Sequence, residues 1–531
     1  MNRHDSGQYS GRNSGQNPAR NPEPSTDAPG QTNTGIILGK PTPWGAALPD
    51  SLFNKGRPGR RGLTFPTWDG EEIDTTLPVE LLRARPADLP ALSEPEVMRH
   101  FIQLSNLNHH IDRGMYPLGS CTMKYNPRLN EQVVSLPGFA QLHPEQDVAD
   151  IQGLLAALFR LQEALCEITG FAACSLHPAA GAHGEYLGML VIRALHLARG
   201  EQERIEILIP DSAHGTNPAS VVMTGMKPVT IPSRTDGRID VMRLREVVGP
   251  QTAGIMITNP NTLGLFETDI IEIAQIIHEA GGRLYMDGAN MNAILGKARP
   301  GDMGFDVVHL NLHKTFSTPH GGGGPGAGPI CVSAELASFL PGPFIVAKDG
   351  RYGFEKVPGP DDEAIHSYFG NIAVCLRALA YILRNGRDGL ERIAERAVLN
   401  ANYLLACLSD ILPVEHADGC LHEFVATGSQ WRRDYKVRTL DIAKRLLDYG
   451  VHAPTIYFPL IVDEALMIEP TESEPKESLD RFVAVIEAIH REAQEDPELL
   501  RKAPHTTPVS RLDEARAARQ PDLSYLGPCG C

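Results

Sequence analysis

Two side chains near the middle of the sequence have the chemistry of a cofactor anchor and its partner. Lys314 follows the apolar run Val307–Leu312, and a lysine that ends a buried strand is poorly placed as a solvated charge. A partly desolvated amine is more readily neutral, and a neutral amine condenses with an aldehyde cofactor. Taken alone, Lys314 is more simply a lysine in a loop beside the glycine run Gly321–Gly326.

Asp287 changes this interpretation because it closes the preceding apolar run, Arg283–Asp287. A carboxylate at a strand end can pair with a pyridine nitrogen and keep it protonated, which makes the ring an electron sink for a carbanion. The alternative is a turn-capping role, since Asp-Gly is a common turn signal. An aldehyde-binding lysine and a pyridine-binding aspartate together predict pyridoxal 5'-phosphate as the cofactor.

A candidate phosphate site lies upstream, in small residues that open the helix predicted over Gly184–Ala198. Ala180, Gly181 and Ala182 have little or no side chain, so backbone N–H groups at the helix start can approach a phosphate. This loop has neither the Lys-Ser/Thr of a P-loop nor the spacing of a dinucleotide fingerprint. His183 either stacks on the cofactor ring or is a satisfied histidine near the helix start.

Two further polar segments follow predicted strands and are rich in small hydrogen-bonding groups, Ser212–Pro218 and Thr258–Thr262. Thr258 or Asn259 is placed to reach the phenolic oxygen of the cofactor, and His214 to contact the ring or the substrate. Each segment also suits an ordinary turn. A phosphate loop, ring partners, an aspartate and a lysine follow one another along the chain. This order indicates a pyridoxal-phosphate site more specifically than any one of these features does.

Alternating strands and helices are expected to position these residues. The predicted strands are Ile205–Ile209, Gly254–Thr258, Arg283–Asp287, Val307–Leu312 and Ile330–Ser333, and the predicted helices include Gly184–Ala198 and Thr268–Ala280. This alternation predicts an α/β fold with a mostly parallel sheet covered on both faces. Ligands of such sheets bind beyond the carboxyl ends of the strands, where the candidate residues occur.

The pattern along the chain predicts five regions. Residues 1–35 are polar and lack the apolar residues needed to offset ordering, so they form a disordered tail. Residues 36–140 are Pro-rich and form an extended arm with a helix near Glu94–Leu107. Residues 141–350 begin with leucines at helical spacing and form the large cofactor-binding domain. Residues 351–510 form a smaller C-terminal α/β domain with long helices over Ile365–Arg384 and Gly389–Leu408 and strands at His422–Ala426 and Ala465–Glu469, and 511–531 form a second tail.

Composition excludes several classes of partner. The net charge of −16 argues against nucleic acid or an anionic membrane as the main partner. No apolar run reaches the roughly 20 residues of a membrane span, and the N-terminus lacks the apolar core of a signal peptide. The nine cysteines show no paired metal-ligand spacing, which indicates reduced thiols in the cytoplasm and no metal. Cys529 and Cys531 either bind metal, form a strained disulfide or are incidental.

Longer motifs around these residues resemble glycine dehydrogenase (decarboxylating), the P protein of the glycine cleavage system. The resemblance covers roughly residues 95–510 and is carried by Pro117–Lys124, Ser212–Ser220, Tyr285–Ala293, His309–Phe316, His320–Gly326, His452–Thr455 and Glu469–Ser473. The family has the fold type I architecture of pyridoxal-phosphate enzymes. One departure is His177, where the family often has Gln before the proline of the phosphate-side loop.

The resemblance implies the substrate, the reaction and the partners. The chain resembles the lysine-bearing half of the family, subunit 2 of its split form, which implies subunit 1 as a partner. Glycine would displace Lys314 from the cofactor and lose CO₂, with Asp287 supporting the carbanion. The aminomethyl group would pass to the lipoyl group of H protein, with His214 and His183 as candidates for proton handling or ring stacking.

Two other functions remain open from the residues. Another fold type I activity, such as an aminotransferase or amino-acid decarboxylase, would use the same lysine and aspartate, although an aminotransferase usually needs an arginine for the substrate carboxylate. A non-catalytic scaffold that binds a partner subunit is the second alternative. The intact Lys314 and Asp287 argue against the scaffold.

Overall fold

The computed structural model describes residues 49–355 and 369–521, except 63, 65, 68–69, 71–77 and 86–88. The described residues belong to one compact unit that spans Leu38–Cys531. The predicted disordered tail, residues 1–35, and the terminal Cys529 and Cys531 lie outside the described residues. No helix in the described part is long and apolar enough to cross a lipid bilayer.

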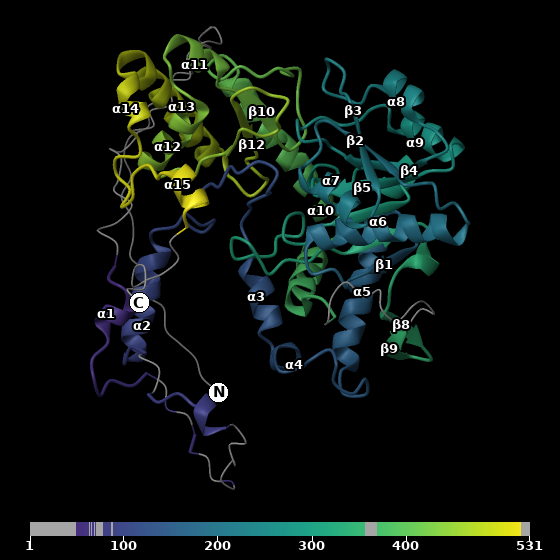
Figure 1. Ribbon diagram of the computed structural model, residues 1–531, viewed down its shortest axis with the longest axis horizontal. Helices are drawn as coiled ribbons and strands as arrows, with labels where there is room; N and C mark the ends of the chain where they lie inside the picture. Colours follow the sequence, from purple (N-terminus) through teal and green to yellow (C-terminus); the bar gives the residue numbers. More distant parts are fainter. Residues whose placement is uncertain are drawn as a thin grey trace, which may run out of the picture. The chain divides into compact units, whose positions relative to one another are not determined.

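A seven-stranded sheet contains the strands that end in the candidate residues (Figure 1). Its strands, in the order β1-β7-β6-β5-β4-β2-β3, are β1 (Ala173–Ser175), β7 (Ile330–Val332), β6 (Val307–Leu310), β5 (Arg283–Gly288), β4 (Thr252–Thr258), β2 (Glu206–Pro210) and β3 (Lys227–Ile231). Neighbouring strands from β3 to β6 pair in parallel, and β7 is antiparallel to β6 and β1. The predicted α/β fold with a mostly parallel sheet is confirmed, while β1 and β3 were not predicted.

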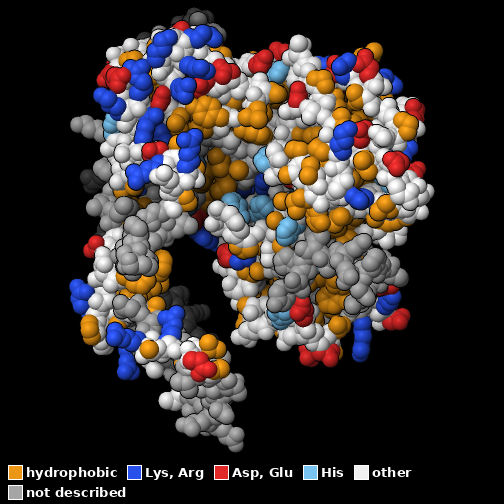
Figure 2. All heavy atoms as spheres, viewed as in Figure 1, with side chains coloured by type: hydrophobic (Ala, Val, Ile, Leu, Met, Phe, Trp, Pro, Cys, Tyr) orange, Lys and Arg blue, Asp and Glu red, His pale blue; other side chains and the backbone are white. Residues whose placement is uncertain are grey.

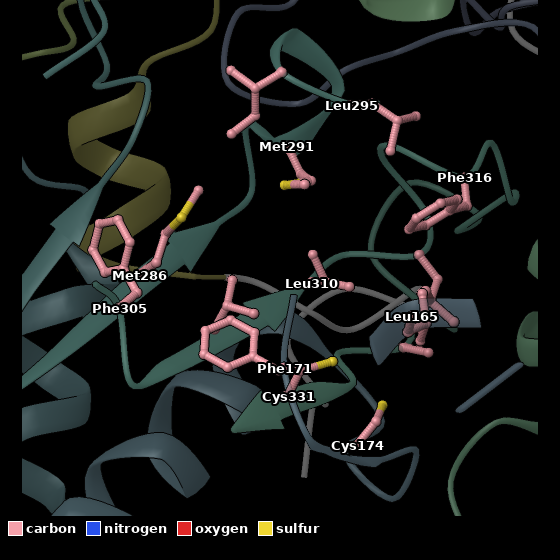
Figure 3. Close-up of a cluster of buried hydrophobic side chains, with 14 of the residues drawn as sticks. Leu165, Phe171, Cys174, Met286, Met291, Leu295, Phe305, Leu310, Phe316 and Cys331 are labelled. Carbon is pink, nitrogen blue, oxygen red and sulfur yellow. The ribbon is translucent and has the colours of Figure 1, made fainter. Parts of the chain in front are cut away.

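The two faces of this sheet bury different hydrophobic clusters. In β5, Leu284 and Met286 join the core with α5 (Gln152–Thr169) and α9 (Ile270–Glu279), whereas Tyr285 joins the core against α6 (Gly181–Ala198). Figure 3 shows the first cluster, in which Met286 and other side chains of the sheet face residues of neighbouring elements. Because side chains alternate along a strand and both faces are covered, the strands read as continuous apolar runs.

The helices of this region follow the predicted spacing. α5 carries the leucines at helical spacing and ends at Gly170, which adopts the left-handed conformation with φ 77°. α6 begins at Gly181, three residues before the predicted start. The remaining elements are α7 (Thr216–Met223), α8 (Val241–Val247), η2 (Met291–Ala293), η3 (Pro300–Met303) and η4 (Ala337–Phe339).

The C-terminal part has its own antiparallel sheet and its own core. Strands β10 (Phe424–Thr427) and β11 (Thr455–Ile456) flank β12 (Ala465–Ile468). The core packs Trp431 and Phe482 with the second half of α10 (Ile372–Leu408). The other elements are the hairpin β8 (Phe344–Lys348) and β9 (Arg351–Glu355), and the helices α11 (Ser429–Asp434), α12 (Thr439–Asp448), α13 (Lys476–Glu495), α14 (Pro497–Arg501) and α15 (Glu514–Arg519).

Helix α10 differs from the two helices predicted over Ile365–Arg384 and Gly389–Leu408. The structure joins them, with non-helical angles at Gly386 alone, and starts the first at Ile372. The later start has a local cause, because Gly370 has a φ of 60° and Asn371 is also non-helical. Residues 365–368 of the predicted helix lie outside the described residues.

The N-terminal part combines short helices with a segment that enters the protein interior. The helical elements are α1 (Leu52–Lys55), η1 (Val79–Leu81), α2 (Glu94–Ser105), α3 (Arg128–Val134) and α4 (Pro137–Ala140). The segment Pro117–Lys124 between α2 and α3 runs against the end of β12, where Leu118 forms a bridge with Ile468. A Cβ on Gly119 would lie 2.2 Å from Met467 Cγ, so this approach requires glycine.

Candidate active site

Three polar side chains lie side by side at the carboxyl ends of adjacent parallel strands. The register pairs Thr258 of β4 with Asp287 of β5, and Asp287 with His309 of β6. All three are buried, and they lie on the α6 face because they alternate with residues of the opposite core. A row of one hydroxyl, one carboxylate and one imidazole at this edge has the position expected for a ligand site in a parallel sheet.

Asp287 lies in a pocket of donors that favour its charged form. Its carboxylate accepts hydrogen bonds from Asn217 Nδ2 at 3.1 Å and from the Ala289 amide at 2.9 Å, and His309 Nε2 lies 3.4 Å away. Burial alone would raise the pKa of Asp287, but His309, Lys314 and these donors together hold that pKa below its ordinary value. The bond from Ala289 agrees with the turn-capping interpretation and leaves the predicted pairing with a pyridine nitrogen open.

His309 is fixed by a close approach of α6 to the sheet. Its Nδ1 lies 2.6 Å from the hydroxyl of Tyr285, which is fully buried, and its Nε2 faces Asp287. A Cβ on Gly184 would lie 2.8 Å from the His309 Cβ, and one on Gly188 would lie 2.2 Å from the Tyr285 ring. The glycines on this face of α6 are therefore required for the helix to pack on the strands that carry the site.

Lys314 lies in the turn that follows β6, because the strand ends at Leu310 and not at the predicted Leu312. Its Nζ donates a 2.8 Å hydrogen bond to the carbonyl of Ser120. Ser120 has a φ of 66°, an uncommon conformation for a residue with a side chain. The lysine is thus held by the Pro117–Lys124 segment, which lies almost two hundred residues earlier in the sequence.

Histidines adjoin this lysine. The rings of His313 and His320 lie 5.7 Å apart, edge to face, and Figure 2 shows histidine side chains gathered near the centre of one face of the molecule. Burial, assisted by the charge of Lys314, lowers the pKa of His313 to about 3 and also lowers that of His320. Both rings are neutral near pH 7 and add no positive charge beside the lysine.

The start of α6 forms the wall that was predicted to bind phosphate. Ala180 is the N-cap residue, and Gly181 and Ala182 occupy the first turn, where backbone N–H groups have no partner within the helix. A Cβ on Gly181 would lie 2.5 Å from Asn311 Nδ2, so the glycine also permits close packing against the chain after β6. His183 is half-buried on the same turn.

These elements enclose a cavity of about 220 Å³. It is lined by Ser120, Gly181, Ala182, Glu185, His214, Thr216, Thr258, Thr262, Asp287, Ala289, His309, Asn311, His313 and Lys314. Six of the eight predicted site residues are therefore brought together here, whereas Ala180 and His183 adjoin the cavity along α6 and do not line it.

Two lining residues differ in how they are held. Among the described residues, the buried Thr258 Oγ1 has no hydrogen-bond partner, so it is available to a ligand. His214 is exposed, its Nδ1 lies 2.9 Å from Thr216 Oγ1, and its ring meets Phe458 edge to face at 5.5 Å. Thr258 thus lines the buried part of the cavity, and His214 lies at its exposed rim.

The structure adds a buried carboxylate that the sequence reasoning missed. Glu185, in the first half of α6, accepts hydrogen bonds from Thr216, Asn217 and Ser220 at 2.9, 3.2 and 3.1 Å. Asn217 donates to both Glu185 and Asp287, so one amide ties the two acids together. Asn217 stands in a motif that carried the family resemblance and Glu185 does not, and their contact requires the packing of α6 on α7.

A second cluster of buried acidic side chains lies close enough to Lys314 to interact with its charge. Glu423, before β10, accepts a 2.7 Å hydrogen bond from the Ser120 amide, and Glu469, after β12, accepts one of 2.9 Å from the Thr122 amide. Both carboxylates and the adjacent His422 are fully buried. The sequence did not suggest these contacts, because each joins residues more than three hundred positions apart.

Lys124, a buried lysine, anchors the C-terminal end of the Pro117–Lys124 segment. Lys124 Nζ donates to Glu472 Oε1 and to the Thr315 carbonyl, each at 2.7 Å, and lies 3.3 Å from the Tyr381 hydroxyl. The contact with Thr315 lies next to Lys314 in sequence. Burial disfavours the charge on Lys124, but Glu472 and Tyr381 together raise its pKa above the ordinary value, so the ion pair is kept.

Comparison with known proteins identifies the family. A model described as the glycine cleavage system P-protein matches residues 70–355, and one described as the glycine dehydrogenase C-terminal domain matches residues 393–505. A protein of Caldanaerobacter subterraneus subsp. tengcongensis named probable glycine dehydrogenase (decarboxylating) subunit 2 is 55% identical over 89% of this chain and 98% of its own length. A protein of the same name from Oceanobacillus iheyensis is 52% identical over the same shares.

Solved structures agree on the fold. A crystal structure of glycine decarboxylase (P-protein) of the glycine cleavage system, in inhibitor-bound form, has a TM-score of 0.66 at 22% identity, covering 78% of this chain and 93% of that one. A NifS-like protein has a TM-score of 0.53 at 15% identity, covering 71% and 99%. The resemblance found in the sequence motifs is confirmed by these matches, and the chain belongs to the glycine cleavage system P-protein family.

Proposed function

We propose that the chain is the cofactor-bearing subunit of a glycine-decarboxylating enzyme, with pyridoxal 5'-phosphate anchored on Lys314. The observation that carries the proposal is the register that places Thr258, Asp287 and His309 in one row beside the cavity that Lys314 lines. Family membership supports glycine as the substrate, because the closely similar proteins are named glycine dehydrogenase (decarboxylating).

The residues of the cavity fit this cofactor. The first-turn N–H groups at Gly181 and Ala182 suit its phosphate, the unpartnered Thr258 hydroxyl suits a ring oxygen, and the ionised Asp287 suits a pyridinium nitrogen. Lys314 supplies the amine that would hold its aldehyde carbon. When bound, the cofactor supplies an electron sink for the carbanion that remains after CO₂ leaves.

The surrounding side chains define what the protein itself does. Asp287 stays ionised and would keep a pyridine nitrogen protonated if the cofactor were bound, and Asn217 and His309 fix the orientation of its carboxylate. The Ser120 carbonyl, which accepts from Lys314 Nζ, would hold the free lysine amine. His214, at the rim, is the candidate for substrate contact, while Ala180 and His183 support the phosphate wall from α6.

The partners follow from the same assignment. The similar proteins are named subunit 2, so we infer that a second subunit completes the enzyme and that lipoylated H protein accepts the aminomethyl group.

We infer a cytoplasmic location, supported by the described cysteines, all of which are unpaired thiols. The separate cores of the large sheet and of β10–β12 support a large cofactor-binding domain and a small C-terminal domain.

Exchange of labelled bicarbonate into glycine tests the proposal. The purified chain, supplied with pyridoxal phosphate, its partner subunit and lipoylated H protein, should catalyse exchange that stops when either protein is omitted. Amino-group transfer to a keto acid, or carbon dioxide release from a different amino acid, would instead favour another fold type I activity. Failure to bind the cofactor at all would favour the scaffold.

A further inference from the structure

The Pro117–Lys124 segment accepts the hydrogen bond of Lys314 and contains two residues with unfavourable backbone angles. Ser120 and Thr122 have φ values of 66° and 48°, and left-handed angles are unfavourable for residues with a Cβ. The amides of these two residues are the ones that donate to Glu423 and Glu469. Two carboxylates thus stabilise the strained turn whose carbonyl accepts the Lys314 amine.

The two carboxylates are too close and too buried to be charged together. Glu423 and Glu469 have no solvent exposure, and ligand atoms of the pair and of His422 all lie within 4.8 Å of one another. Like charges at this separation in a buried site leave one group protonated. Among the described residues, Glu423 Oε1 and both ring nitrogens of His422 have no hydrogen-bond partner.

Among the described residues, the groups that face the pair supply one countercharge. The titratable and charged residues around it are Lys314, Cys121, Cys420, His422 and Glu472. Burial lowers the pKa of His422 to about 3 and raises the pKa values of the Cys121 and Cys420 thiols, so all three are neutral. Glu472 is already paired with Lys124. The remaining cation is Lys314.

We propose that Glu423 and Glu469 share one proton and position the displaced Lys314 amine, holding it on the Ser120 carbonyl beside a single negative charge. The proposal rests on the proposed function, since it concerns the lysine once the substrate amine has replaced it. The single negative charge attracts Lys314 toward the Ser120 carbonyl without holding it against two negative charges. These two residues are positioning residues, because Glu423 acts on Lys314 through Ser120 and Glu469 acts through Thr122 of the same turn.

The pKa shifts agree with this geometry and predict which acid carries the proton. Burial, with the charge of Glu469 next in importance, raises the pKa of Glu423 well above its ordinary value. Burial also raises the pKa of Glu469, but the bonds from Thr122 and the charge of Lys314 limit the rise to about 6. At neutral pH, Glu423 is therefore the acid and Glu469 the carboxylate.

Infrared spectroscopy of the full chain without cofactor tests the shared proton directly. At pH 7 the wild-type spectrum should contain a carboxylic acid C=O band that shifts in D₂O and is lost in Glu423→Gln. Glu469→Gln should retain the band, because the proton stays on Glu423. Glu464→Gln is the matched control, since Glu464 is a buried acid that accepts from the Thr439 amide away from the cavity.

Kinetics of the reconstituted enzyme test the positioning role. Glutamine at 423 imitates the protonated acid and leaves the charge on Glu469, so Glu423→Gln should lower the exchange rate less than Glu469→Gln does. Glu469→Gln removes the charge and should lower kcat roughly 100-fold, the size of one lost electrostatic contact. It should also remove the acid limb of the pH–rate profile, whereas Glu464→Gln should change neither.

A purely structural role makes a different prediction. If the carboxylates act only as hydrogen-bond acceptors for Ser120 and Thr122, both glutamine variants should be equally active and have the wild-type pH profile. That result, or the absence of the infrared band, would overturn the inference while wild-type exchange remained intact. Loss of wild-type exchange with the band still present would instead refute the proposed function and leave the shared proton standing.

Discussion

Two buried acidic clusters face Lys314, and they differ in how their charges are satisfied. On the large sheet, Asp287 receives bonds from Asn217 and Ala289 and faces His309, and its pKa lies below the ordinary value. On the small sheet, Glu423 receives one bond from Ser120, and its pKa lies well above the ordinary value. Burial is similar at both sites, so the neighbouring charges and the hydrogen-bond donors, not depth, decide which carboxylate is ionised.

The difference has opposite consequences for stability. A carboxylate with a lowered pKa stabilises the fold at neutral pH, and this stabilisation is lost as the pH falls through the folded-state pKa. A carboxylate with a raised pKa does the reverse, because ionising it in the folded state costs energy as the pH rises. Ionised Asp287 therefore adds to stability at neutral pH, whereas ionising the acidic pair beside Ser120 lowers it, and the proposed roles of the two clusters carry opposite costs.

The largest effect is expected from the residue between the two clusters. Lys314→Ala should abolish the absorbance of the lysine-linked cofactor and lower exchange activity roughly 10⁶-fold, as removal of a covalent catalytic group does elsewhere. Absorbance spectroscopy and labelled-bicarbonate exchange measure the two effects. Unchanged turnover in this variant would remove both clusters from the active site.

Asp287→Asn should have the next largest effect, because it removes the ionised member of the large-sheet cluster without changing its shape. Some cofactor should be retained, while exchange activity should fall roughly 100- to 1,000-fold, the range for one lost electrostatic contact. Spectral titration with pyridoxal phosphate separates binding from turnover. Wild-type activity here would contradict the electron-sink role of Asp287.

Glu469→Gln should separate stability from function on the small sheet. The free energy of unfolding at pH 8, measured by denaturant titration, should exceed that of wild type by about 1–2 kcal/mol, because ionising the buried Glu469 costs free energy in the folded state even with Lys314 nearby. The gain should disappear below the unfolded-state pKa of about 4.5, where wild-type Glu469 is protonated in both states. A lower stability at pH 8 would show that the carboxylate is fully compensated.

Tyr285→Phe should have the smallest effect and tests how rigidly the large-sheet cluster is held. Loss of the hydroxyl leaves His309 Nδ1 without its 2.6 Å partner, which should cost about 1 kcal/mol of stability. Activity should fall less than in Asp287→Asn, since the carboxylate keeps its other donors. Thermal unfolding and exchange kinetics of the two variants, measured in parallel, give the comparison.

The position of Lys314 and Asp287 after strands was predictable because it follows from local patterns. Apolar runs identified β4, β5 and β6, and parallel strands present their carboxyl ends at one edge, so Thr258 and Asp287 were expected there before the register was known. The start of α6 was predictable in the same way from small residues before a helix. Boundaries were less exact, as the end of β6 at Leu310 shows.

The order of residues along the chain was sufficient for five strands of the large sheet, for the place of Lys314 after a strand and for the family motifs, since each depends on neighbours within a few residues or on one strand following another. It was not sufficient for the roles of Glu423, Glu469 and Ser120. Their contacts join segments more than three hundred residues apart, and no local pattern encodes such a pairing. Whether a buried carboxylate is charged depends on the donors that folding brings to it, and that is a property of packing.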